Sequence, residues 1–311
     1  MVARLKGQSQ NTTPRHPPTC TKPTPFGYTL KETASATTPR PISFTAMLPT
    51  ALLLASVVVL SPALTKWKAE IEERDGGKII LVPIETDAKS NTMILPEDIE
   101  ARPVLRRFFL SEDFRGQLAS AHALTVNSDP AEGKFHFILL NMARAEQWRE
   151  AEEALLAHEF GHIWLNATGY SGLPYQPGPD SCLAINAGDV VQHVLIRREM
   201  KRRGIPNLPY WLPNLERSLA ALEQAGAAAP PLTGCPKLVQ LTQWVDARLG
   251  LTVEDWSKLP RFLALLEKDY PDLAPLADDL AEYIGYRDIS DPEQYRRVLE
   301  FSRRKFGKVA P

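Results

Sequence analysis

Residues 143–166 read ARAEQWREAEEALLAHEFGHIWLN, and this segment decides the fold class of the chain. Helix-favouring residues dominate it, and Gly161 is its single glycine. Apolar side chains in its second half fall on all sides of a helical wheel, so we expect a long helix that is buried on most sides. Gly169 is placed to end this helix.

The segment carries His158, Glu159 and His162 in the spacing His-Glu-x-x-His. Residues four apart project from one face of a helix, so the two imidazoles can bind a single Zn2+ ion. Glu159 lies beside them, where a carboxylate can accept a proton from water and return it to a leaving amine. A shuffled chain of this composition would contain roughly 0.008 such matches, so chance is a poor explanation. The spacing predicts a zinc-dependent hydrolase with Glu159 as general base.

The stretch Leu155-Leu-Ala-His-Glu-Phe-Gly-His-Ile-Trp-Leu165 resembles the active-site helix of the zincin superfamily of metallopeptidases. The resemblance covers this helix and its neighbours, not the whole chain. The metzincin pattern would need Gly at Leu165 and His at Thr168, and the chain has neither. The layout instead resembles that of thermolysin-like gluzincins, in which a later helix supplies the third zinc ligand. The resemblance implies a zinc cofactor and a peptide or protein substrate.

A third zinc ligand is expected on a second helix, residues 181–203, because two histidines alone would hold zinc weakly. Gluzincins usually place a Glu there with an Asp four residues further on, whereas this chain reads Asp189-Val-Val-Gln-His193. Side chains four apart on a helix lie about 40° from each other around its axis. Either His193 or Asp189 is therefore expected to bind the metal while the other orients a ligand, and His122 and His136 are less favoured.

Two other groups lie near these helices in the sequence. Tyr170, Tyr175 and Tyr210 are in flanking segments and are candidates to stabilise an oxyanion. The end of helix 181–203 is strongly basic and is expected to be a solvated face that suits the helix dipole; it comprises Arg197, Arg198, Lys201, Arg202 and Arg203.

The elements around the motif predict an α+β fold that is mostly helical. Two apolar segments, residues 78–82 and 134–141, are predicted to be strands of a small sheet. The motif helix and the helix 181–203 follow, and residues from about 207 to 311 are predicted to be a helical C-terminal region. Residues 66–311 would together form one zincin-like metallopeptidase domain.

The N-terminal part of the chain differs from the rest in composition. Residues 1–46 are basic and rich in Pro, Ser and Thr, which indicates a disordered leader or a misassigned upstream segment. Residues 47–65 contain an uncharged apolar run followed by Ser61-Pro-Ala63, which is typical of a signal peptide and its cleavage site. An uncleaved N-terminal membrane anchor is one alternative, and an organelle transit peptide, which the basic leader favours and the long apolar run does not, is another. The signal peptide and the anchor both predict an exported protein.

Charge and cysteine content limit the partners. A formal net charge of −1 gives no basic field to attract a nucleic acid, so nucleic-acid binding is not expected. Cys182 and Cys235 either pair in an oxidising compartment or remain two separate thiols. Two alternatives to a metallopeptidase stay open: a non-catalytic binding protein stabilised by its metal, and a zinc amidase acting on a cell-wall peptide. The oligomeric state is not predicted.

Overall fold

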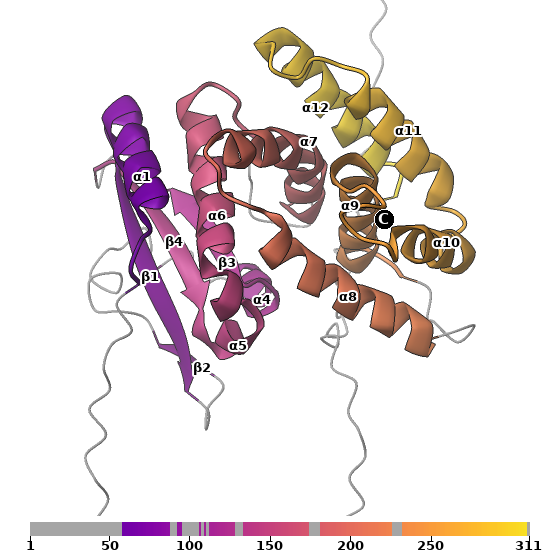
Figure 1. The fold of residues 1–311 in the computed structure, drawn as a ribbon, viewed down its shortest axis with the longest axis horizontal. Helices are drawn as coiled ribbons and strands as arrows, with labels where there is room; N and C mark the ends of the chain where they lie inside the picture. The colour runs from indigo at the N-terminus through magenta and orange to yellow at the C-terminus, as the bar shows by residue number, and fades with distance from the viewer. Residues whose placement is uncertain are drawn as a thin grey trace, which may run out of the picture. The chain divides into compact units, whose positions relative to one another are not determined.

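A computed structural model of the chain has an α+β fold that is mostly helical, as the sequence predicts (Figure 1). The structure describes residues 58–87, 92–94, 106, 109, 112–127, 133–173, 181–225 and 232–309. Their helices and strands divide into a small sheet with its covering helices and a helical C-terminal region.

The sheet has four strands in the order β2-β1-β4-β3. Strands β1 (Lys78–Asp87) and β4 (Phe135–Asn141) are parallel, while β2 (Thr92–Ile94) and β3 (Ala123–Asn127) run antiparallel to their neighbours. Both predicted strands therefore form. Strand β1 continues through Pro83 because β2 pairs with it only from Glu85 onward, and proline is tolerated where a strand lacks a second neighbour.

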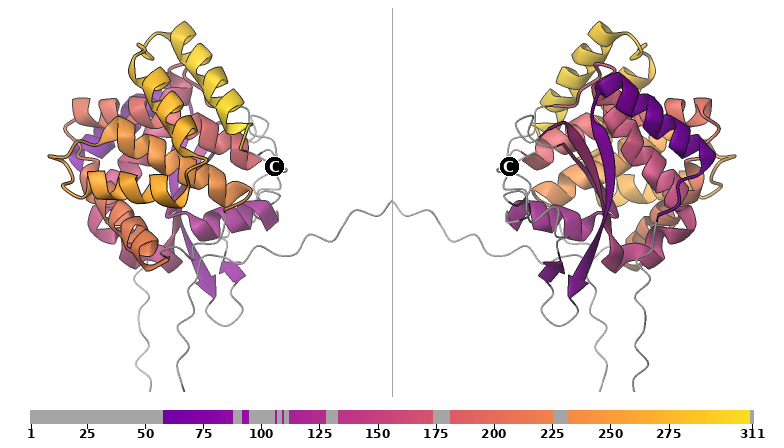
Figure 2. Two further views of the ribbon diagram at one scale, coloured as in Figure 1. Left: turned by 90° about the vertical axis from the view of Figure 1, so that its right-hand side faces the viewer. Right: turned by 90° about the vertical axis from the view of Figure 1, so that its left-hand side faces the viewer.

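Alternate residues of the central strands face two different helical layers. Ile138 and Leu140 of β4 pack against α1 (Pro62–Asp75) and α6 (Glu152–Ala167). Phe137 and Leu139 face the opposite layer, which includes Leu118 of α4 (Glu112–Ser120). The right-hand view of Figure 2 shows α4 on one side of the strands and α1 and α6 on the other. This alternation places the motif helix α6 directly on the sheet.

The segment 143–166 is helical, but it is built in consecutive pieces. Residues Met142–Arg144 and Arg149–Ala151 are 3-10 turns that flank the short helix α5 (Ala145–Trp148), and α6 begins only at Glu152. Trp148 is buried at this irregular point, and its indole N–H donates to the carbonyl of Asn141. The part that carries the motif is regular throughout.

Helix α7 joins the sheet region to the C-terminal helices. It spans Ser181–Arg202, close to the predicted range, and packs on α6 on one side and on α9 and α12 on the other. Figure 1 shows α9 to α12 on the far side of α7 from the sheet. The C-terminal helices are α8 (Leu208–Ala225), α9 (Cys235–Gly250), α10 (Leu259–Asp269), α11 (Ala274–Gly285) and α12 (Pro292–Phe306).

The predicted leader, residues 1–46, lies outside the described residues, as does most of the predicted signal peptide or anchor. Among the described residues, no helix combines the length and apolar composition needed to cross a membrane. The predicted cleavage site lies at the beginning of α1, where the Ser61 hydroxyl caps the helix by accepting from the N–H of Leu64. Cleavage after Ala63 would therefore remove this cap and the first residues of the helix.

Candidate metal centre

Three histidines from two helices meet at one point between α6 and α7. One ring nitrogen from each of His158, His162 and His193 lies within 4.8 Å of the other two. The Nε2 atoms of His158 and His162 are 3.3 Å apart, and the ring centroids of His158 and His193 are 4.8 Å apart. Two nitrogens bound at about 2.0–2.1 Å from a tetrahedral zinc ion would be about 3.3 Å apart. The spacing of the motif histidines and the all-imidazole donor set therefore fit zinc.

The environment keeps the motif histidines in the form that binds a metal. Burial lowers the pKa of His158 well below its ordinary value, and the neighbouring His193 and His162 lower it further. Burial also lowers the pKa of His162 to about 3. Both rings are therefore neutral at pH 7 and offer a lone pair, which a metal ligand requires.

Glu159 is held beside the histidines by the edge strand of the sheet. Its side chain is buried, and the hydroxyl of Thr125 on β3 donates to its Oε2 at 2.7 Å. Burial raises the pKa of Glu159 to about 7; the hydrogen bond from Thr125 opposes this shift and the charge of Asp189 adds to it. A carboxyl group with a pKa near neutrality is suited to accept and release a proton.

His162 is oriented by an amide on the facing helix. Its Nδ1 lies 3.1 Å from Oε1 of Gln192, and the Nε2 of Gln192 donates to the carbonyl of Tyr170 at 3.1 Å. Because Gln192 donates through its nitrogen to Tyr170, its oxygen faces His162 and accepts from Nδ1–H. The remaining nitrogen of His162, Nε2, is then free to bind the metal.

Of the two candidates for the third ligand, the structure groups His193 with the motif histidines, while Asp189 is not part of the group. Asp189 is partly buried, and burial raises its pKa to about 6. The carboxylate that contacts His193 directly was not predicted: it is Asp246 on α9, whose Oδ2 lies 2.6 Å from Nδ1 of His193, while the charge of Asp189 also acts on His193. Burial alone would lower the pKa of His193, but the Asp246 carboxylate raises it above its ordinary value.

The candidate tyrosines have different surroundings. Tyr210 lies in the first turn of α8, its ring centroid is 6.4 Å from that of His158, and its hydroxyl is 3.2 Å from Nδ1 of His122. Tyr170 donates its hydroxyl to the carbonyl of Ser290, and its ring packs edge-on against Tyr295 of α12. Tyr175 lies outside the described residues. Of the candidate tyrosines that the structure describes, Tyr210 is therefore the one whose ring lies next to a motif histidine.

Two sequence interpretations outside the ligand set are corrected or clarified. The prediction of a solvated basic end is wrong for Arg197, which pairs with the buried Asp246, and for Arg203, which lies over the Trp67 ring. His136 is not part of the histidine group, and its Nε2 is 2.6 Å from Asp75 Oδ2 at the end of α1. His122 contacts Tyr210 and is likewise not part of the histidine group.

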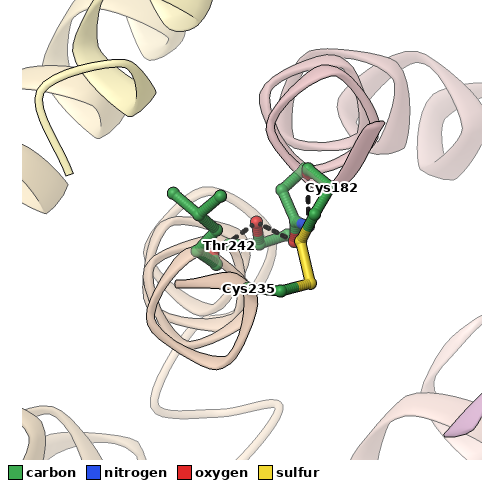
Figure 3. The surroundings of a disulfide bond; sticks show 5 residues. Cys182, Cys235 and Thr242 are labelled. Atoms are coloured by element: carbon green, nitrogen blue, oxygen red, sulfur yellow. Dashed lines mark hydrogen bonds between the residues drawn. A yellow bond between two sulfur atoms is a disulfide. The ribbon is translucent and has the colours of Figure 1, made fainter. Parts of the chain in front are cut away.

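A disulfide joins the two helices that carry His193 and Asp246. Cys182 at the start of α7 is bonded to Cys235 at the start of α9, with their Cα atoms 5.7 Å apart (Figure 3). Next to it, the Thr242 hydroxyl donates to the side-chain oxygen of Asn186 at 2.8 Å. The two cysteines are therefore paired, which decides between the alternatives that the sequence left open.

Sequence reasoning did not find Thr125, Gln192, Arg197 or Asp246 as members of the centre. Asp246 did carry a usable signal, because it is an acid inside the apolar run Trp244-Val-Asp-Ala247 of a helix, at a position where a charge is unusual without a partner. The partner lies 53 residues away, so the sequence alone could not identify it.

The chain matches no protein-family model, no curated protein and no solved structure.

Proposed function

We propose that the protein is a zinc-dependent hydrolase, and specifically a metallopeptidase. The observation that carries the proposal is the convergence of His158, His162 and His193 next to the buried carboxylate of Glu159. A zinc ion bound there would lower the pKa of a water molecule and polarise the carbonyl group of a substrate. Among the described residues, three side chains make up the donor group, which favours a catalytic site over a closed structural one with four protein ligands.

Glu159 acts as the general base in this proposal. Since Thr125 holds Oε2, Oε1 is the oxygen expected to take the proton from the attacking water and to pass it to the leaving nitrogen. The hydroxyl of Tyr210, beside His158, is the side-chain donor best placed to hydrogen-bond the oxyanion that develops on the carbonyl. In the structure this hydroxyl donates to Nδ1 of His122, because Nε2–H of His122 faces Oε1 of Gln147, so Tyr210 would turn its hydrogen from His122 to the oxyanion during the reaction.

The sheet favours an extended peptide as the substrate. Among the described residues, β3 is an edge strand, and its Thr125 contacts the proposed general base. An extended chain can pair with the backbone of such an edge, which would bring a peptide bond toward the metal centre. A cell-wall peptide would satisfy the same geometry, so it falls within this proposal as a substrate class.

The disulfide supports a location outside the reducing cytoplasm. Structural disulfides form and persist in secreted and periplasmic proteins. The bond between Cys182 and Cys235 is in keeping with the export that residues 47–65 predict. Export or membrane anchoring is therefore part of the proposal.

The general base is tested with Glu159→Gln, with Glu153→Gln as the matched control. Both residues lie on α6, but Glu153 is exposed to solvent whereas Glu159 is buried. The full chain is assayed for zinc by elemental analysis and for cleavage of a mixed pool of quenched fluorescent peptides. We expect Glu159→Gln to keep zinc and lose cleavage, and Glu153→Gln to keep both. Undiminished cleavage by Glu159→Gln would refute the assigned role.

The ligand set is tested by the zinc content of His193→Ala and Asp189→Ala. Loss of a ligand should deplete zinc, so we expect His193→Ala to purify without metal and Asp189→Ala to retain it. The reverse pattern would make Asp189 the third ligand.

A further inference from the structure

The buried carboxylate of Asp246 lies behind the third histidine of the metal centre. Asp246 is only 6% exposed to solvent. Its two carboxylate oxygens have separate partners: Oδ2 is 2.6 Å from Nδ1 of His193, and Oδ1 accepts from Nη1 of Arg197 at 3.0 Å. A carboxylate is costly to bury unless it is paired. These two contacts account for the burial of the Asp246 carboxylate.

Arg197 is itself fixed by aromatic packing. Its guanidinium carbon lies 4.9 Å from the ring centroid of Trp211 on α8. Gly250 at the end of α9 permits this arrangement, because a Cβ atom there would be 2.5 Å from the Trp211 ring and 2.8 Å from Nε of Arg197. Three helices of the C-terminal half thus hold the Asp246 carboxylate in one position.

We propose that Asp246 is a positioning residue that fixes the ring of His193 so that its Nε2 atom faces the metal. An ionised carboxylate can only accept hydrogen bonds, so Nδ1 of His193 must carry the hydrogen that points at Oδ2. In the neutral ring, Nε2 is then the nitrogen with the free lone pair. The inference rests on the proposed zinc site and assigns to the C-terminal helices the task of presenting its third ligand.

The hydrogen-bond partner of His193, Asp246, differs in charge from the partner of His162, Gln192. Gln192, which faces Nδ1 of His162, is a neutral amide, whereas Asp246 carries a charge. An anionic partner raises the basicity of a metal-bound imidazole as well as fixing its orientation. The third ligand is consequently the one that should respond most strongly to the loss of its partner.

The test compares zinc affinities of the full-length wild type, Asp246→Asn and Asp278→Asn, measured by competition with a chromophoric chelator. Asp278→Asn is the matched control, since Asp278 also pairs with α9, through Arg248, but lies at the surface. We expect Asp246→Asn to bind zinc about 10- to 100-fold more weakly. Asp278→Asn should stay within about twofold of wild type, because surface pairs contribute little.

Absorption of the Co2+-loaded proteins provides a readout that a merely structural role would not change. The ligand-field bands should shift in Asp246→Asn and not in Asp278→Asn. Wild-type affinity and an unchanged spectrum in Asp246→Asn would overturn the inference while leaving the zinc site intact. A wild-type chain that takes up no zinc would overturn the proposed function as well.

A second variant covers the case in which Asp246→Asn does not fold. Arg197→Gln keeps the contact between Asp246 and His193 but removes the cation that holds the other carboxylate oxygen. We expect a smaller loss of zinc affinity than in Asp246→Asn, and an unchanged affinity would count against the inference.

Discussion

Gly161, which directly precedes the second histidine of the motif, has a packing role that explains its presence inside a helix. A Cβ atom at this position would lie 2.6 Å from Cγ2 and 2.8 Å from Cγ1 of Ile196 on α7. These distances are too short for real contacts, so the absence of a side chain lets α6 and α7 approach. The close approach is what brings His193 to the motif histidines.

We therefore expect Gly161→Ala to destabilise the protein, although alanine is the better helix former. The helical preference would add about 1 kcal/mol, whereas overpacking a core costs about 1–3 kcal/mol, and the second effect should prevail. Urea unfolding measures the difference. Gly116→Ala on α4 is the control, because a Cβ there meets nothing within 4 Å, and it should be neutral or stabilising. A stabilised Gly161→Ala would contradict the packing explanation.

The carboxylate of Asp75 contributes to the stability of the folded state in a way that depends on pH. Burial alone would raise the pKa of Asp75, but hydrogen bonds and charge from Lys134 and His136 outweigh it and hold the pKa below its ordinary value. A carboxyl group with a lowered pKa in the folded state stabilises that state above the pKa of the unfolded chain. This stabilisation is lost as the pH falls through the folded-state pKa.

We expect wild type to have a larger free energy of unfolding than Asp75→Asn at neutral pH. The difference should be constant near neutral pH and shrink below about pH 4, the ordinary range of an Asp carboxyl. Denaturant unfolding at several pH values measures it. Asp272→Asn, which removes a solvent-exposed partner of Lys237, should show little difference at any pH. A wild-type advantage that persists undiminished in strong acid would refute the role of Asp75.

At the scale of elements, the sequence was most informative where the determining interactions are local. The strand at residues 134–141 and the helix at 181–203 form nearly within their predicted bounds, because apolar pattern, capping and stop signals act over a few residues. Residues 119–126 divide into the end of α4 and most of β3, and no local signal in the sequence separates the two. Their strand part is decided by pairing with β4, which lies further along the chain.

The disulfide between α7 and α9 acts at the element scale. It closes a loop with a sequence separation of 53 residues, so its removal should lower the free energy of unfolding by about 4 kcal/mol in the chain-entropy description. We expect this loss in the variant Cys182→Ala/Cys235→Ala, measured by denaturant unfolding without reductant. Wild type with excess reductant should approach the same value. Equal stability of oxidised wild type and the double variant would show that the bond does not constrain the chain.

At the scale of the whole molecule, α7 contributes residues to two hydrophobic cores, that of the C-terminal helices and that between α6 and the sheet. Ala187, Val190 and Val191 pack in the C-terminal core, whereas Ile196 and Met200 pack with α6 and the sheet. His193 lies in the sequence between these two groups. The sequence identified the motif from the spacing of residues within one helix. It offered His193 as one of two ligand candidates because His193 lies on the next helix along the chain. It could not supply Asp246 or Thr125, whose positions depend on how the two cores meet.

Because the proposed ligands come from α6 and α7, zinc should stabilise this whole assembly. A ligand that binds only the folded state adds about 2.7 kcal/mol of stability at a concentration 100 times its Kd. We expect the thermal midpoint of wild type to rise with added Zn2+ and to fall after chelation. Mg2+ should have no such effect, since it prefers oxygen ligands in octahedral geometry.

The control for this linkage is His158→Ala/His162→Ala, which should show one midpoint whether or not zinc is present. Glu159→Gln should respond as wild type does, because Glu159 is outside the donor group. Asp246→Asn should need a higher zinc concentration than wild type for the same rise in thermal midpoint. The stabilisation depends on the ratio of zinc concentration to Kd, and we expect the Kd of this variant to be higher. If chelation leaves the wild-type midpoint unchanged, zinc does not bind the folded chain, and the three histidines must then be explained by packing alone.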